Sequence, residues 1–214
     1  MTLIETVSIE SLLHLAPVIP VVVIEDPAHA VPLARALVAG GLPVIEVTLR
    51  TGAALEAVRA IAEEVPDAIV GTGTVRRPAD LDASAEAGAR FAVSPGASPD
   101  LIAAARGHAV GWLPGAATAS EAMTLAEHGF GFQKFFPAEA AGGTALLRSL
   151  HGPLPEIRFC ATGGIGLGNA GDYLATPNVA CVGGSWVTPA KRMAAGDWAG
   201  IERLAREAAA LRAG

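Results

Sequence analysis

Eight short apolar stretches alternate with helical patterns along the chain, and this alternation constrains the fold more than any other feature of the sequence. Apolar strands that are separated by helices form parallel βαβ units, and eight such units in one chain close into a barrel. The apolar stretches are residues 17–24, 44–49, 68–72, 90–93, 109–113, 132–136, 157–161 and 178–182. The helical patterns are residues 26–39, 53–64, 78–87, 99–106, 120–127, 144–150, 169–174 and, as closing helices, 189–211.

We therefore predict an α/β protein, a single (β/α)8 TIM barrel that spans residues 1–214. A short amphipathic helix at residues 8–15 precedes the first strand. The chain contains no linker, composition break or low-complexity tract, which favours one domain. An open, doubly wound parallel sheet has the same alternation and is the alternative architecture.

Composition and charge exclude several classes of protein. The chain is 51% hydrophobic and 17% charged, so it is not disordered, and its net charge of −6 argues against a nucleic-acid binder. Cys160 and Cys181 lie in apolar stretches and are predicted to be reduced thiols in the core. No secretory leader and no apolar run of membrane-spanning length is present, so we expect a cytoplasmic protein that does not contact membranes.

The histidines lack the spacing of a metal site. They fall in helices or beside helices, and no HxH or HxxxH pair occurs among them. We therefore expect no metal ion and no other cofactor. The five histidines are residues 14, 29, 108, 128 and 151.

Lys134 is one of only two lysines in the chain, and phenylalanines flank it on both sides. Strand alternation places Phe132, Lys134 and Phe136 on one face, which would point the lysine into the barrel, while Gln133 faces the helices. Desolvation of a buried ammonium favours the neutral amine, and a neutral lysine is the nucleophile that forms Schiff bases with carbonyl substrates. A lysine that snorkels to the surface from a strand end is the competing interpretation.

Glu46 is the second candidate catalytic residue. It shares the inward face of its strand with Thr48, and Arg50 lies at the end of that strand. An acid inside a barrel costs desolvation energy unless it is paired or used in chemistry. A structural ion pair between Glu46 and Arg50 is the alternative to a catalytic role.

Glycine pairs follow the seventh and eighth predicted strands, at Gly163-Gly164 and Gly183-Gly184. Barrels of this type commonly hold a phosphate there, because backbone N–H groups can approach its oxygens where no Cβ intervenes. Ser185 adds a hydroxyl to the second pair. Two tight turns without a ligand are the alternative interpretation.

These features resemble the 2-keto-3-deoxy-6-phosphogluconate (KDPG)/4-hydroxy-2-oxoglutarate (KHG) aldolase family. Residues 41–50, Gly-Leu-Pro-Val-Ile-Glu-Val-Thr-Leu-Arg, fit its first signature, and residues 129–142 resemble its second, the Schiff-base lysine motif. Gln133 stands where that motif has an apolar residue. Further segments that look like family members are residues 70–75, 94–96, 162–165 and 183–186.

The resemblance implies a role for each matching residue. Lys134 would form the Schiff base and Glu46 would act as general acid and base. The substrate-binding residues that it implies are Arg50 and Thr74 for the pyruvate carboxylate, Pro95 and Phe136 lining that end, Thr162 for the substrate chain, and Gly163, Gly164, Gly184 and Ser185 for the distal phosphate. It also implies a homotrimer, no metal and a place in the Entner–Doudoroff pathway.

The expected reaction is cleavage of 2-dehydro-3-deoxy-6-phosphogluconate to pyruvate and D-glyceraldehyde 3-phosphate. A phosphorylated 2-keto acid is thus the expected small-molecule partner, with 4-hydroxy-2-oxoglutarate as a second substrate that yields pyruvate and glyoxylate. Two other functions remain open at this point. One is a cofactor-free phosphosugar isomerase with Glu46 as base, and the other is a non-catalytic phosphometabolite-binding barrel with a buried acid–lysine pair.

Overall fold

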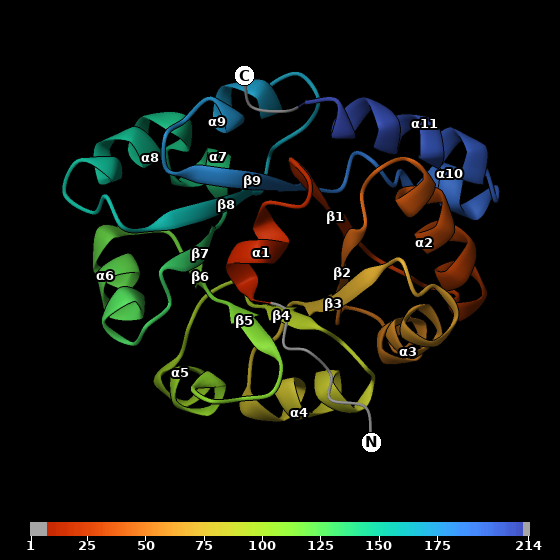
Figure 1. Ribbon diagram of the computed structural model, residues 1–214, viewed down its shortest axis with the longest axis horizontal. Helices are drawn as coiled ribbons and strands as arrows, with labels where there is room; N and C mark the ends of the chain where they lie inside the picture. Colours follow the sequence, from red (N-terminus) through yellow and green to blue (C-terminus); the bar gives the residue numbers. More distant parts are fainter. Residues whose placement is uncertain (1–7, 212–214) are drawn as a thin grey trace.

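The computed structural model describes residues 8–211, and these form a closed ring of parallel strands surrounded by helices (Figure 1). Every strand pairing is parallel, in the order β5-β4-β3-β2-β1-β9-β8-β7-β6. The predicted (β/α)8 barrel is confirmed, and the open sheet is wrong. The strands are β1 Val18–Val22, β2 Val44–Thr48, β3 Ile69–Gly73, β4 Phe91–Val93, β5 Gly111–Leu113, β6 Gly115–Ala116, β7 Phe132–Phe135, β8 Arg158–Thr162 and β9 Val179–Gly184.

The fifth barrel strand is split into β5 and β6 at Pro114, which the sequence pattern did not predict. β5 pairs with β4, and β6 pairs with β7, so the two halves together close the ring. Proline has no N–H to donate to a ladder, which interrupts regular pairing at this residue. Its carbonyl still accepts a hydrogen bond from the Lys134 N–H at 2.7 Å.

Some of the helices begin at capping side chains. Ser98 caps α5, and Thr118 and Glu121 form a capping box at the start of α6. A short α7 precedes α8, and only α8 had been predicted. The helices are α1 Ile9–Leu13, the 3-10 helix η1 Pro27–His29, α2 Ala30–Ala39, α3 Ala54–Glu64, α4 Pro78–Glu86, α5 Pro99–Ala105, α6 Ala119–Glu127, α7 Ala138–Ala141, α8 Gly143–His151, α9 Ala170–Leu174, α10 Ala190–Ala194 and α11 Trp198–Ala209.

Side chains alternate along each strand between the barrel interior and the helix layer. On β2, Ile45 and Val47 pack in the large cluster beneath the helices, whereas Val44 belongs to a separate interior cluster. On β7, Phe135 faces the helices and packs edge-on against Phe159. The predicted inward and outward faces of both strands are therefore confirmed.

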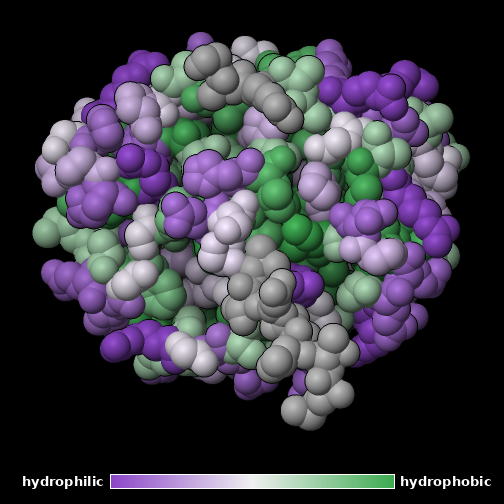
Figure 2. All heavy atoms as spheres, in the orientation of Figure 1, coloured by the Kyte–Doolittle hydropathy of each residue, from purple (hydrophilic) through white to green (hydrophobic). Residues whose placement is uncertain are grey.

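Helix α1 closes the end of the barrel at which the strands begin, and it lies over the centre of the ring in Figure 1. Leu12 and Leu13 are buried in the interior cluster with Ile19, Phe91 and other residues at the strand beginnings. From the same side, Figure 2 shows apolar side chains near the middle of this face and hydrophilic ones over the surrounding helices. Chemistry is thus left to the opposite end, where the strands terminate.

Within residues 8–211, the helices are too short or too polar for any of them to span a lipid bilayer.

Candidate functional site

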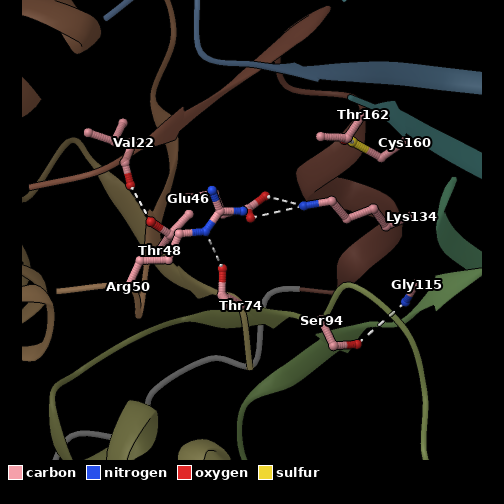
Figure 3. A network of polar contacts seen from close by, with 10 residues as sticks. All are labelled: Val22, Glu46, Thr48, Arg50, Thr74, Ser94, Gly115, Lys134, Cys160 and Thr162. Carbon is pink, nitrogen blue, oxygen red and sulfur yellow. Dashed lines mark hydrogen bonds and ion pairs between the residues drawn. The ribbon is translucent and has the colours of Figure 1, made fainter. Parts of the chain in front are cut away.

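Lys134 and Glu46 meet inside the barrel near the carboxyl ends of their strands (Figure 3). Lys134 Nζ donates to Glu46 Oε1 at 3.0 Å and to Oε2 at 3.3 Å. Only 5% of Lys134 and 3% of Glu46 is exposed, which makes a snorkelling lysine untenable. Burial strengthens the attraction between the two charges, and it also makes loss of either partner costly.

A glycine on the neighbouring strand makes room for this pair. A Cβ added to Gly73 would lie 2.2 Å from Glu46 Oε1, far inside van der Waals contact. The inward carboxylate therefore requires a residue without a side chain at this position of β3. Aromatic packing is also present, since Lys134 Nζ lies 5.4 Å from the centroid of the Phe136 ring.

Arg50 is not the partner of Glu46, so the alternative of a Glu46–Arg50 ion pair is wrong. Its Nε donates instead to Thr74 Oγ1 at 3.1 Å (Figure 3). Thr74 has a φ of 61°, a left-handed conformation that a β-branched residue adopts only at a cost. Such backbone strain persists where the surrounding structure fixes it, and it concentrates at functional sites.

A cavity of about 310 Å³ opens above Lys134. Its wall includes the predicted glycine pairs, Gly163 and Gly164 after β8 and Gly183 and Gly184 at the end of β9, and its volume is that of a small-ligand site. The lining residues are Val21, Val23, Arg50, Lys134, Phe136, Thr162, Gly163, Gly164, Ile165, Gly183, Gly184 and Ser185.

The loops after β8 and β9 present unused backbone donors to this cavity. Among the described residues, the N–H groups of Gly163, Gly164 and Ser185 donate to no group of the chain. Gly163 and Gly164 have φ values of 106° and 76°, which only glycine adopts readily. Successive free N–H groups of this kind form a concave site for an anion.

The structure brings most of the predicted site residues together, but not all in the same way. Glu46 and Thr74 do not line the cavity, but each is hydrogen-bonded to a residue that does. Glu46 accepts from Lys134, and Thr74 accepts from Arg50. Pro95 is exposed, its backbone lies against Gly115, and it is not among the residues that line the cavity. Its predicted contact with a substrate stays a prediction.

Sequence reasoning did not identify Val21, Val23 and Ile165 as part of the cavity wall. Val21 and Val23 continue the inward face of β1, but that stretch is apolar on both faces and so gave no signal. Gly183, which belongs to the second predicted glycine pair, leaves room for its register partner: a Cβ there would lie 2.3 Å from Thr162 Oγ1.

Two thiols lie beneath the cavity. Cys160 and Cys181 are register partners on β8 and β9, both are buried and neither forms a disulfide, as predicted. The hydrogen bond to Cys160 and burial raise the pKa of Cys181, which keeps that thiol protonated. Within residues 8–211, no three His, Cys, Asp or Glu side chains are grouped as a metal site would need.

A buried amine beside a carboxylate, at the floor of a cavity with an anion-binding rim, suits one kind of chemistry. The amine can add to a ketone, the carboxylate can accept and return protons, and the rim can hold an anionic tail. Arg50 supplies a cation for a second anionic group. The site is thus built for a small keto acid with a charge at each end.

Comparison with known proteins agrees with this chemistry. The sequence model of the family described as "KDPG and KHG aldolase" matches residues 9–204. A KHG/KDPG aldolase of Escherichia coli (strain K12) is 52% identical over 201 residues, which cover 94% of each protein.

Two solved structures are similar in both sequence and fold. The KDPG aldolase of Legionella pneumophila, with pyruvate captured as a covalent carbinolamine, superposes with a TM-score of 0.92 at 42% identity, over 94% of this chain and 97% of that one. The Zymomonas mobilis ZM4 enzyme with 3-phosphoglycerate superposes with a TM-score of 0.91 at 49% identity, over 95% of both chains.

Proposed function

This chain belongs to the KDPG and KHG aldolase family, and on that basis we propose that it is a class I aldolase. Its proposed substrate is 2-dehydro-3-deoxy-6-phosphogluconate, which it would cleave to pyruvate and D-glyceraldehyde 3-phosphate. The observation that carries the proposal is the buried contact of 3.0 Å between Lys134 Nζ and Glu46 Oε1 beneath the cavity. The relative that holds pyruvate as a covalent carbinolamine supports the same chemistry.

Schiff-base formation begins with transfer of a proton from Lys134 to Glu46 along their hydrogen bond. The neutral amine then adds to the C2 ketone of the substrate, and the carbinolamine loses water to give a protonated imine. Glu46 returns its proton to the departing hydroxyl. The low exposure of both residues keeps bulk water from competing for these protons.

Carbon–carbon cleavage then uses the imine as an electron sink. Glu46 takes the proton of the C4 hydroxyl as the C3–C4 bond breaks, which releases the aldehyde and leaves an enamine on Lys134. The same carboxylic acid protonates the enamine at C3. Hydrolysis of the resulting imine releases pyruvate and restores the ion pair.

Anion-binding groups at two sides of the cavity would orient the substrate. We propose that Arg50, held by Thr74, binds the pyruvate carboxylate, with Phe136 packed beside it. Thr162 would contact the substrate chain. At the other side, Gly163, Gly164 and Ser185 would hold the phosphate through backbone N–H groups and the serine hydroxyl, and Gly184, which has no side chain, would let the phosphate approach the backbone.

A coupled assay with lactate dehydrogenase tests the proposal. Release of pyruvate from 2-dehydro-3-deoxy-6-phosphogluconate is the expected result, and comparison with its galactonate epimer and with 4-hydroxy-2-oxoglutarate ranks the three substrates. Calorimetric binding without release of pyruvate would instead favour the non-catalytic barrel. Turnover without pyruvate would favour an isomerase.

A separate variant tests whether the glycine loops and Ser185 bind the phosphate of the substrate. Ser185→Ala should impair cleavage of the phosphorylated substrate and spare 4-hydroxy-2-oxoglutarate. Gly164→Ala tests the same loop less cleanly, because its Cβ would lie 2.6 Å from Glu139 Cγ. Equal losses for both substrates in Ser185→Ala would contradict the assignment.

Assembly and location follow from the family resemblance alone. We propose a homotrimer in the cytoplasm, with a role in the Entner–Doudoroff pathway. Light scattering coupled to size-exclusion chromatography should give three times the chain mass of 21.6 kDa. A mass of one or two chains would contradict the trimer.

A further inference from the structure

The glycine loop after β8 is held in place by groups outside the cavity. Gly163 O accepts a hydrogen bond from the Glu139 N–H at 3.1 Å, and Gly164 O accepts one from Asn169 Nδ2 at 3.2 Å. Asn169 Oδ1 in turn accepts from the Gly166 N–H at 2.8 Å. Both glycine carbonyls are therefore fixed, while their N–H groups, at the wall of the cavity, donate to no described group of the chain.

Glu139 supports the loop with its side chain as well. A Cβ built on Gly164 would lie 2.7 Å from Glu139 Cβ and 2.6 Å from its Cγ, so the aliphatic stem lies directly against this glycine. The carboxylate at the end of that stem is an unfavourable neighbour for an anion in the loop. Its orientation therefore matters for any phosphate held there.

Tyr173 fixes that orientation. Its hydroxyl, which comes from α9, donates a hydrogen bond to Glu139 Oε1 on α7. The tyrosine ring is buried, with 1% of the residue exposed, so the donor is immobile. Burial, the hydrogen bond to Glu139 and the charge of that carboxylate raise the pKa of Tyr173, so the phenol keeps its proton.

We propose that Glu139 and Tyr173 are positioning residues for the phosphate of the substrate. Tyr173 holds the Glu139 carboxylate away from the anion, and the Glu139 backbone and stem hold Gly163 and Gly164 with their N–H groups toward it. Neither residue lines the cavity or touches the reacting atoms. The inference rests on the proposed function in one respect, namely that the anion bound at this loop is a substrate phosphate.

The pair explains how an acidic residue can lie next to an anion site without weakening it. A hydrogen bond donated by a neutral phenol disperses the negative charge of the carboxylate and fixes its direction. Without the phenol hydroxyl, the carboxylate would be free to rotate toward the loop and repel the phosphate. The reaction centre at Lys134 would be unaffected, because no described contact joins it to either positioning residue.

Tyr173→Phe is the primary variant, because it removes one hydroxyl and keeps the buried ring. We expect KM for the phosphorylated substrate to rise about tenfold, the effect of one charge-assisted hydrogen bond, with kcat within about twofold. Kinetics with 4-hydroxy-2-oxoglutarate should change by less than about twofold, since that substrate carries no phosphate.

Glu139→Gln separates the charge of the side chain from its shape. The amide oxygen still accepts from Tyr173 and the stem still supports Gly164, so affinity for the phosphorylated substrate should stay within about twofold of wild type. The double variant Tyr173→Phe/Glu139→Gln should regain most of what Tyr173→Phe loses, because a neutral amide does not repel phosphate. Failure of the double variant to regain affinity would overturn the role assigned to the charge.

Glu121→Gln is the matched control. Glu121 also lies in the first turn of a helix after a barrel strand, where its carboxylate accepts from Ala117 N at 2.8 Å and Thr118 N at 3.0 Å. It has no contact with the glycine loop. Thermal unfolding of each variant reports on folding, and Glu139→Ala, which should also lose phosphate affinity, replaces Tyr173→Phe if that protein does not fold.

Calorimetry with inorganic phosphate decides the inference independently of turnover. Wild-type protein should bind phosphate, and Tyr173→Phe should bind it about tenfold more weakly, whether or not pyruvate is released in the coupled assay. Absence of phosphate binding in the wild type, or equal binding by both proteins, would overturn the inference. Absence of pyruvate release would overturn the proposed function only.

Discussion

The two ends of the barrel are built from the same strands and have opposite chemistry. At the amino end, the inward positions carry Val44 on β2 and Phe132 on β7, which pack in an apolar cluster under α1. Two residues further along, the same faces carry Glu46 and Lys134. On each of these strands, a distance of two residues thus separates the part that stabilises the barrel from the part that would perform chemistry.

The charged carboxyl end of the barrel adds little to the stability of the fold. A buried ion pair gains little over apolar residues of similar volume, because desolvation of both charges offsets their attraction. The amino end gains its stability from apolar burial, to which each large side chain contributes about 1.5–3 kcal/mol. Variants at the carboxyl end should therefore lose mainly activity, and variants at the amino end should lose mainly stability.

Lys134→Met should have the largest effect of all. Pyruvate release should fall by about 10⁶-fold, as when a covalent nucleophile is removed from an enzyme. The variant should remain folded, although Glu46 left unpaired costs about 3–5 kcal/mol. Lys191→Met is the control, because Lys191 is the other lysine of the chain and lies exposed on α10.

Glu46→Gln should lower kcat by about 10²–10⁴-fold, the usual contribution of a general acid or base. The double variant Lys134→Met/Glu46→Gln should be more stable to urea than Lys134→Met, since it leaves no unpaired buried carboxylate, and it should remain inactive. Kinetic and urea-unfolding measurements on the three proteins separate the two effects. A Glu46→Gln variant with the kcat of wild type would contradict the role of Glu46 as general acid and base.

Phe91→Ala should produce the opposite result at the amino end. Loss of this buried ring should lower the free energy of unfolding by about 3–5 kcal/mol, measured by urea denaturation. At a temperature where the variant is folded, kcat should stay within a few-fold of wild type. A variant that keeps its stability and loses its activity would break the division between the two ends.

Asp80→Asn should have the smallest effect and tests how the carboxyl-end loop that carries Thr74 is held. Burial raises the pKa of Asp80, but hydrogen bonds from the Arg76 N–H and from Arg77 outweigh it and hold the pKa below its usual range. Because the pKa of Asp80 is lower in the folded state than in the unfolded state, its carboxylate stabilises the fold at pH values above about 3.9. This stabilisation is lost as the pH falls through the pKa of the folded state.

Urea unfolding of Asp80→Asn should therefore show a loss of about 1 kcal/mol at neutral pH. The difference from wild type should shrink as the pH falls below about 3.9. A difference that is independent of pH would mean that the carboxylate charge plays no part in holding this loop.

Sequence periodicity predicted the barrel and the inward direction of Lys134 and Glu46, because strand alternation is a local property. The orientation of Gln133 toward the helices was predicted in the same way, and its Nε2 indeed donates to Ala122 O on α6 at 2.9 Å. The sequence left Arg50 and Lys134 as alternative partners of Glu46. Lys134 lies 88 residues away on a strand across the barrel, and side-chain reach rather than sequence spacing decides the contact.

Other features were not predicted from the sequence, for similar reasons. The predicted strand ended at residue 113, so β6 after Pro114 was missed because two residues give no alternation, and α7 is a single turn too short for a periodic signal. The roles of Glu139 and Tyr173 depend on how two helices meet behind a loop, which is a matter of tertiary packing.

Borohydride reduction in the presence of pyruvate shows whether Lys134 forms a Schiff base with the substrate ketone. Wild-type protein should gain the mass of one reduced pyruvate adduct, and peptide mapping should place that adduct on Lys134. Lys134→Met should gain none, while Lys191→Met should label as wild type does. No adduct in the wild type, or an adduct on Lys191, would contradict the account.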